Sequence, residues 1–161
     1  MLVEIYVTSG AGEGTTPLAA FDQALTRAGI ANCNLMYLSS VIPPGVCLRQ
    51  GQPPLLGGWG DRLYVVIAQQ REVVTGTEAW AGIGWVQELG SGRGLFVEHH
   101  GNSQHQVEAQ IHETMQSMLA YRDGDWGDID FVTVGITCEK NPVCAVAAAV
   151  YQAEPWLSLP A

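Results

Sequence analysis

Two adjacent serines, Ser39 and Ser40, stand directly before the segment Val41-Ile42-Pro43-Pro44. A serine held in a constrained turn can attack the preceding carbonyl carbon through its own hydroxyl and convert an amide into an ester. The two prolines restrict the backbone just downstream and would help to hold that geometry. By pattern alone, an ordinary pair of serines at the end of a strand is the commoner explanation.

Other residues that could bind a metal or a phosphate form weaker patterns. Three of the histidines His99, His100, His105 and His112 could bind zinc, but surface or interface histidines explain the cluster more simply. The small-residue segment from Ser9 to Gly14 matches neither phosphate-binding glycine motif, so it is predicted to be a flexible loop. We therefore predict no metal site and no phosphate site.

The elements that position the serines are predicted from apolar periodicity and from glycine and proline. A helix is expected over Pro17 to Ala28, with Thr16 as its N-cap and Gly29 after its end. A second helix begins after Ser103 and runs to about Tyr121. Seven strands are predicted: Leu2 to Thr8, Asn34 to Ser39, Arg62 to Ala68, Ala79 to Gln87, Gly94 to His99, Phe131 to Glu139, and Cys144 to Tyr151.

The segment from Cys47 to Gly60 is rich in Gly, Pro and Gln and is predicted to be a loop. Runs of strands interrupted by only two helices favour an α+β fold. Two helices cannot cover both faces of so many strands, so further sheet surface must pack against another sheet or another subunit.

Composition narrows the class of protein. Of 161 residues, 47% are hydrophobic and 14% are charged, against about 25% charged in typical soluble domains. The length fits one domain. The high apolar and low charged fractions exclude disorder as the main state. The same apolar excess favours a homo-oligomer, in which more surface is buried. With 16 acidic residues, 7 basic residues and a net charge of −9, binding to nucleic acid or to an anionic membrane is not expected.

The cellular compartment of the protein is inferred from its N-terminal segment and its cysteines. The segment Met1 to Ile5 lacks the basic and apolar regions of a signal peptide, and no apolar run is long enough to span a bilayer. The four cysteines (Cys33, Cys47, Cys138, Cys144) show no paired CxxC spacing, so free thiols are favoured over two disulfides. We predict a cytoplasmic protein.

Several segments together closely resemble the pyruvoyl-dependent arginine decarboxylases. The resemblance rests on Pro17 to Leu25, Ala28-Gly29-Ile30, Asn34-Leu35, Ser39 to Pro44, Gly94 to Glu98, and Cys144 to Val150. These segments agree in order and spacing, and the similarity extends from about residue 5 to residue 152. The serine pair with its upstream helix is the most specific part.

The resemblance implies a fold and an assembly. A single decarboxylase domain over residues 1–155 would form an αββα sandwich of mainly antiparallel sheets, followed by a tail over residues 156–161. The chain would cleave itself between Ser39 and Ser40 into a β chain (residues 1–39) and an α chain (residues 40–161). The cleaved protomers would then assemble as a trimer.

The resemblance also implies the chemistry. Ser40 would become a covalent pyruvoyl group, which forms a Schiff base with the α-amine of L-arginine and withdraws electrons as carbon dioxide leaves, giving agmatine. Asn34 matches the residue that assists self-cleavage, and Glu98 matches the acid that protonates the α-carbon. Asp22 matches the acid that binds the guanidinium, reaching into the site of a neighbouring subunit.

Two alternatives remain open from the sequence. The pyruvoyl group could serve the decarboxylation of a different amino acid, since the choice of arginine depends on Asp22. The chain could also be a relative without catalysis that acts in assembly or binding, although Ser40, Asn34, Glu98 and Asp22 are all retained. His99-His100 directly follows Glu98, where it would alter the local proton chemistry.

Overall fold

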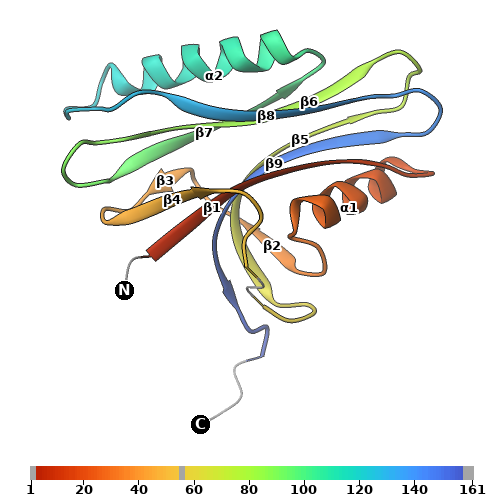
Figure 1. Ribbon diagram of the computed structural model, residues 1–161, viewed down its shortest axis with the longest axis horizontal. Coiled ribbons are helices and arrows are strands. Elements are labelled where there is room, and N and C mark those ends of the chain that lie inside the picture. The colour runs from red at the N-terminus through yellow and green to blue at the C-terminus, as the bar shows by residue number, and fades with distance from the viewer. Residues whose placement is uncertain (1–2, 55–56, 158–161) are drawn as a thin grey trace.

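A computed structural model describes residues 3–54 and 57–157 of the chain. Over those residues the chain forms nine strands and two helices, and the α+β class predicted from the element order is confirmed (Figure 1). The helices are α1 (Pro17–Ala28) and α2 (Gln104–Leu119). The strands are β1 (Val3–Glu13), β2 (Asn34–Tyr37), β3 (Val41–Ile42), β4 (Val46–Gln50), β5 (Arg62–Glu72), β6 (Glu78–Gln87), β7 (Gly94–Gly101), β8 (Asp130–Thr137) and β9 (Val143–Glu154).

The described strands form two sheets that are mostly antiparallel. The first sheet has the order β2-β5-β9-β1-β4 and the second has the order β3-β7-β6-β8. Only the pairs at the two edges of the first sheet, β1 with β4 and β2 with β5, are parallel. The long strand β9 is central, because it pairs with β1 on one side and with β5 on the other.

The layers follow from which side chains each face buries. Phe96 and Ile83 from the second sheet pack against Ile5 and Ala147 from the first, and this cluster fills the space between the sheets. Helix α1 covers the outer face of the first sheet through Ala24 and its apolar neighbours, while α2 covers the outer face of the second. Figure 1 shows the resulting order of helix, sheet, sheet and helix.

The helix ends are set by the residues that the sequence predicts. The Thr16 hydroxyl accepts a hydrogen bond from the Ala19 amide at 3.1 Å, and Gly29 ends α1 in the left-handed region at φ 79°. The Ser103 hydroxyl caps α2 by accepting from the Gln106 amide at 3.1 Å. Helix α2 ends at Leu119, slightly earlier than predicted.

The predicted glycine-rich loop from Ser9 to Gly14 is wrong, because β1 continues through Glu13. A Cβ atom at Gly10 would lie 2.4 Å from the Ala24 carbonyl oxygen, and one at Gly12 would lie 2.5 Å from the Ala24 amide nitrogen. The glycines therefore let helix α1 lie directly on the strand. Their spacing reflects close packing of helix and strand rather than a flexible turn.

The predicted loop from Cys47 to Gly60 is also partly wrong, because it begins inside the edge strand β4. Strand β4 pairs in parallel with the start of β1, with Val46 opposite Val3. Such pairing is set by a distant strand, so the local abundance of Gly and Pro did not reveal it. Residues 55–56 of the predicted loop lie outside the described part.

The predicted tail over residues 156–161 is described only as far as residue 157. Its first residue contacts the domain, since the Trp156 amide donates to Asp61 at 3.2 Å and the Arg62 guanidinium lies 5.3 Å from the Trp156 ring centroid. Leu2, the predicted start of the first strand, lies outside the described residues. None of the described helices is long and apolar enough to cross a membrane.

The close approach of α1 to β1 predicts a position-specific effect on stability. Gly10→Ala should lower the free energy of unfolding by about 1–3 kcal/mol, because the added methyl group meets helix backbone that cannot move alone. Gly58→Ala is the matched control, since its Cβ would meet only an Asp61 carboxylate oxygen at 3.5 Å. Thermal unfolding of both variants checks this, and equal stability would contradict the packing described here.

Candidate active site

Ser40 lies in a strained turn between β2 and β3. Its φ angle is 64°, one of two positive values among the described non-glycine residues. An L-residue in the left-handed region costs about 1–2 kcal/mol and persists only where surrounding contacts hold it. One such contact is a hydrogen bond of 2.8 Å from the Phe96 amide to the Ser40 carbonyl oxygen. The serine predicted to react is therefore held in an unusual backbone conformation.

The Ser40 hydroxyl faces the carboxylate of Glu98. Its Oγ lies 2.9 Å from one Glu98 oxygen and 3.1 Å from the other, across 58 residues of sequence. The contact exists because β3 pairs with β7, which carries Glu98 on the same face as Phe96. A hydroxyl donating to a carboxylate is the arrangement in which a base can remove the hydroxyl proton.

The surroundings adjust the proton affinity of Glu98. Although Glu98 keeps some exposed surface, desolvation by the surrounding chain raises the pKa of its carboxyl above the ordinary value. Hydrogen bonds from Ser40 and from its own backbone amide act in the opposite direction and are smaller. A carboxyl with a raised pKa is a stronger base when ionised and keeps a proton to a higher pH.

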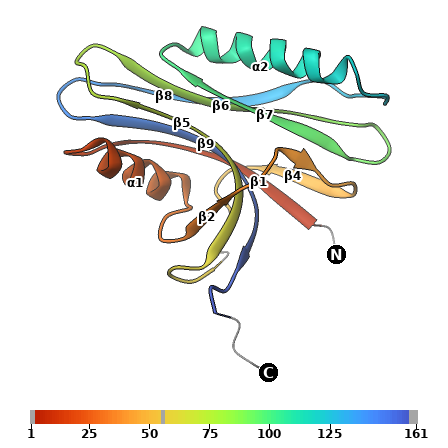
Figure 2. The same ribbon diagram turned by 180° about the vertical axis from the view of Figure 1, so that it is seen from behind.

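Asp22 lies away from Ser40 within one protomer. It is exposed on α1, and within residues 3–54 and 57–157 its carboxylate has no hydrogen-bond or ion-pair partner. Helix α1 covers the far end of β1, whereas β4 lies toward the other end of the molecule, as does β3, which directly follows Ser40 (Figures 1 and 2). One chain therefore does not bring Asp22 to Ser40.

Asn34 also lies apart from the serine pair. Its side-chain amide donates to the Gly60 carbonyl at 2.8 Å, at the start of β2. The chain from Asn34 to Leu38 runs alongside β5, and a strand rise of about 3.3 Å per residue puts roughly 13 Å between these two backbones. Within the protomer, the partner of Asn34 is thus Gly60 and not the Ser39 carbonyl. Ser39 itself is exposed beside the turn.

The histidines are engaged in other contacts. His99 Nε2 lies 2.7 Å from the Thr114 hydroxyl on α2, and His100 Nδ1 lies 2.5 Å from the Gln70 side-chain oxygen. Burial, and then the neighbouring His100, lower the pKa of His99. Among the described residues no group of three or more His, Cys, Asp or Glu side chains is arranged to hold a metal. All four cysteines are free thiols.

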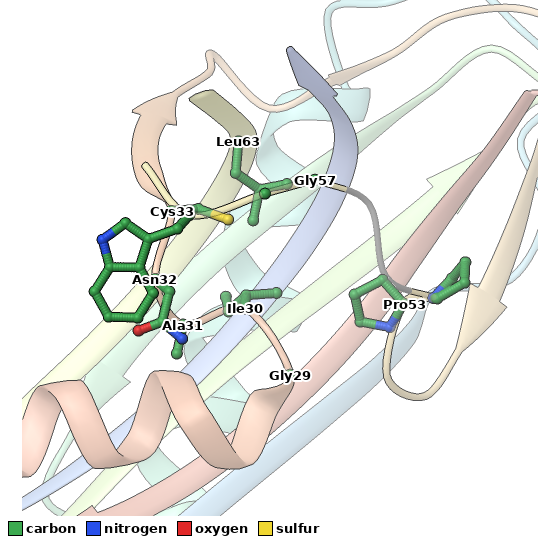
Figure 3. A pocket seen from close by; sticks show the side chains of 11 residues that line it. Gly29, Ile30, Ala31, Asn32, Cys33, Pro53, Gly57 and Leu63 are labelled. Atoms are coloured by element: carbon green, nitrogen blue, oxygen red, sulfur yellow. The ribbon is translucent and has the colours of Figure 1, made fainter. Parts of the chain in front are cut away.

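A cavity of about 180 Å³ lies beyond the end of α1 (Figure 3). Ile30, Cys33, Trp59 and Leu63 are among its lining residues, and Ser40, Asp22 and Glu98 are not. Burial raises the pKa of the Cys33 thiol, which disfavours its reactive thiolate form. The cavity therefore contributes nothing to the site at Ser40.

Tyr151 is a site residue that the sequence did not reveal. The residue was predicted only as the end of a strand, yet its hydroxyl donates to the carbonyl of Val41, the residue after Ser40, at 2.7 Å. Its ring also contacts Phe96 edge to face, with 6.1 Å between centroids. The only sequence feature that could have indicated this role is the position of Tyr151, an aromatic residue at the end of an alanine-rich segment.

Comparisons with known proteins identify the family to which the chain is similar. The family model for pyruvoyl-dependent arginine decarboxylases matches residues 4–155. A pyruvoyl-dependent arginine decarboxylase of Pyrococcus furiosus is 32% identical over 143 residues, covering 88% of this chain and 90% of the relative. Another from Methanocaldococcus jannaschii is 32% identical over 147 residues, covering 90% and 87%, and one from Thermococcus sibiricus is 31% identical over 143 residues, covering 88% and 90%.

The α+β fold, with a serine in a left-handed turn facing a carboxyl group, occurs here in a chain that matches a family of decarboxylases dependent on a pyruvoyl group. The chain belongs to the pyruvoyl-dependent arginine decarboxylase family. It is accordingly an enzyme, and the resemblance found in its sequence is confirmed.

The strain at Ser40 predicts different stabilities for two variants. Ser40→Gly and Ser40→Ala both lose the hydrogen bonds to Glu98, but only glycine adopts φ 64° without steric cost. Ser40→Gly should therefore be more stable than Ser40→Ala by about 1 kcal/mol. Thermal unfolding of the two purified variants measures the difference, and a more stable alanine variant would show that the turn is not strained.

Proposed function

We propose that the chain cleaves itself between Ser39 and Ser40 and then decarboxylates L-arginine to agmatine and carbon dioxide. The observation that carries this proposal is the Ser40 hydroxyl, which lies 2.9 Å from the Glu98 carboxylate on a left-handed turn. The family membership supports the same reaction class. An ordinary strand-ending serine would need neither the strain nor the carboxylate.

In the first step Glu98 takes the proton of the Ser40 hydroxyl as Oγ attacks the carbonyl carbon of Ser39. The peptide bond between the two serines breaks, an ester forms through Oγ, and the Ser40 nitrogen becomes a free amine. Loss of the Ser40 α-proton then breaks the bond between Cβ and Oγ and releases Ser39 as a carboxylate. The remaining dehydroalanine takes up one water and releases ammonia, which leaves a ketone at residue 40.

The residues around Ser40 fit the pyruvoyl group that this sequence of steps produces. The Ser40 carbonyl becomes the amide carbonyl of the group, and the Phe96 amide already donates to that oxygen at 2.8 Å. The pyruvoyl group supplies a ketone that condenses with the substrate α-amine and accepts electrons as carbon dioxide leaves. Glu98, on the same face of β7 as Phe96, is placed to deliver a proton next to residue 40.

The choice of arginine rests on Asp22. A carboxylate binds a guanidinium with two parallel hydrogen bonds, a geometry that lysine cannot offer. Because α1 and the Ser40 turn lie toward opposite ends of one protomer, Asp22 would serve the site of a neighbouring copy in the proposed trimer (Figure 1). Apolar residues are exposed near both sites: Val41 beside Ser40 is 58% exposed, and Leu18 on α1 is 66% exposed. Such residues provide apolar surface that an interface between copies would bury.

Self-cleavage is tested by denaturing electrophoresis of the purified chain. The wild type should separate into residues 1–39 and 40–161, and Ser40→Ala should stay intact because it has no hydroxyl to attack the Ser39 carbonyl. A wild-type chain that stays intact on prolonged incubation would refute the proposed processing.

The raised pKa of Glu98 predicts opposite pH dependences for the two reactions. Cleavage needs the ionised carboxyl, so its rate should rise as pH increases through that pKa. Decarboxylation needs the protonated carboxyl, so kcat should fall as pH increases through the pKa of Glu98 in the processed chain, which has lost the Ser40 hydroxyl and its pKa-lowering hydrogen bond. Glu98→Gln should slow both reactions and remove both pH dependences. Profiles that run in the same direction would contradict a shared role for Glu98.

The intersubunit role of Asp22 is tested by co-expressing a weakly active variant with an inactive one. Asp22→Asn should raise KM for arginine and lower kcat/KM about 30- to 100-fold, corresponding to about 2–3 kcal/mol for a broken charge pair. Ser40→Ala cannot form the reactive group. Co-expressing both chains should restore sites that combine one intact Asp22 with one intact Ser40. Carbon dioxide release from arginine measures the recovery, and release from aspartate instead of arginine would reassign the substrate.

A further inference from the structure

Tyr151 on β9 connects the first sheet to the turn that carries Ser40. Its hydroxyl donates a hydrogen bond of 2.7 Å to the Val41 carbonyl oxygen, across 110 residues of sequence. Its ring packs against Phe96 on β7 with 6.1 Å between centroids and an interplanar angle of 66°. The side chain thus contacts the residue after the reactive serine as well as the strand behind it.

Two consecutive carbonyl groups of the turn are held from opposite sides. The Phe96 amide on the second sheet holds the carbonyl of Ser40, and the Tyr151 hydroxyl on the first sheet holds the carbonyl of Val41. A backbone at φ 64° relaxes unless its neighbours fix it. Of the described side chains, Tyr151 is the one that donates a hydrogen bond to the backbone of Ser40 or Val41.

The hydroxyl of Tyr151 is suited to act as a permanent donor. Burial, and then the negative charge of Glu98, raise the pKa of Tyr151 above its ordinary value. The phenol therefore stays protonated throughout the pH range in which the enzyme would work. Its proton is donated to the Val41 carbonyl oxygen, so the hydroxyl fixes the position of the turn and does not transfer a proton.

We propose that Tyr151 is a positioning residue, which holds the Ser40–Val41 segment in the conformation required for self-cleavage and then for decarboxylation. The inference rests on the proposed function of Ser40. After cleavage, residue 40 remains attached only through the nitrogen of Val41. The hydrogen bond to Val41 and the strand pairing of Val41 with Leu95 then fix the new chain end beside Glu98.

Tyr151→Phe removes the hydroxyl and keeps the ring that contacts Phe96. The first-order rate of cleavage, followed by electrophoresis of freshly purified precursor, should fall about tenfold or more, because tenfold corresponds to about 1.4 kcal/mol in the barrier and hydrogen bonds contribute energies of that order. In the fraction that does cleave, kcat should fall while KM for arginine stays unchanged, since the substrate side chain binds elsewhere.

The matched control is Tyr6→Phe on the neighbouring strand β1. Tyr6 faces the α1 side of the same sheet, and its hydroxyl donates to Glu4 at 2.8 Å. This variant also loses one tyrosine hydroxyl hydrogen bond but does not touch the turn, so its cleavage rate should match the wild type. Circular dichroism and thermal unfolding of both variants register any general loss of structure.

The possible outcomes separate the role of Tyr151 from the proposed function. Wild-type cleavage rate and kcat in Tyr151→Phe would overturn the role of Tyr151 and leave the proposed function standing. Equal slowing in Tyr151→Phe and Tyr6→Phe would also overturn it, because the effect would then follow from the sheet and not from the turn. A wild-type precursor that never cleaves would overturn both proposals. A Tyr151→Phe chain that fails to fold while Tyr6→Phe folds would assign Tyr151 to stability and refute the positioning role.

Discussion

The left-handed conformation of Ser40 is the constraint on which the rest of the site depends. A serine at φ 64° is disfavoured by itself, so the surrounding fold must supply the contacts that keep it there. Those contacts come from both sheets: the Phe96 amide and the Glu98 carboxylate from β7, and the Tyr151 hydroxyl from β9. The packing of the two sheets brings these strands to one turn.

This arrangement places Ser40 at the rim of the inter-sheet core. Phe96 is fully buried there, while Glu98, two residues further along β7, reaches solvent but remains partly desolvated. One carboxyl group can thus accept a proton when ionised and return one when protonated. Asp22, which is proposed to bind the guanidinium of the substrate, is separated from this centre because it lies on the outer helix α1. Under the proposed function, a second copy of the chain would therefore complete each site.

Local sequence signals identified the helices and most strands, because these depend on neighbouring residues, whereas the special role of the serine pair emerged only from the family resemblance. Thr16, Gly29 and Ser103 cap helices through contacts within a few positions of the chain. The errors occurred where distant segments decide the outcome. Gly10 and Gly12 suggested a loop until α1 was seen to lie against them, and β4 forms because the distant start of β1 pairs with it.

Glu98 was identified by family resemblance and not by pattern. Tyr151 was missed because 110 residues separate it from the carbonyl it holds.

The central claim, that Ser40 becomes the reactive group, is tested most directly by the intact mass of the chain that begins at residue 40. We expect a fragment lighter by one ammonia than the same peptide with an N-terminal serine, with a ketone that reacts with hydrazines and no free α-amine. A fragment carrying an unmodified serine amine at residue 40, or a chain left whole while it decarboxylates arginine, would contradict it.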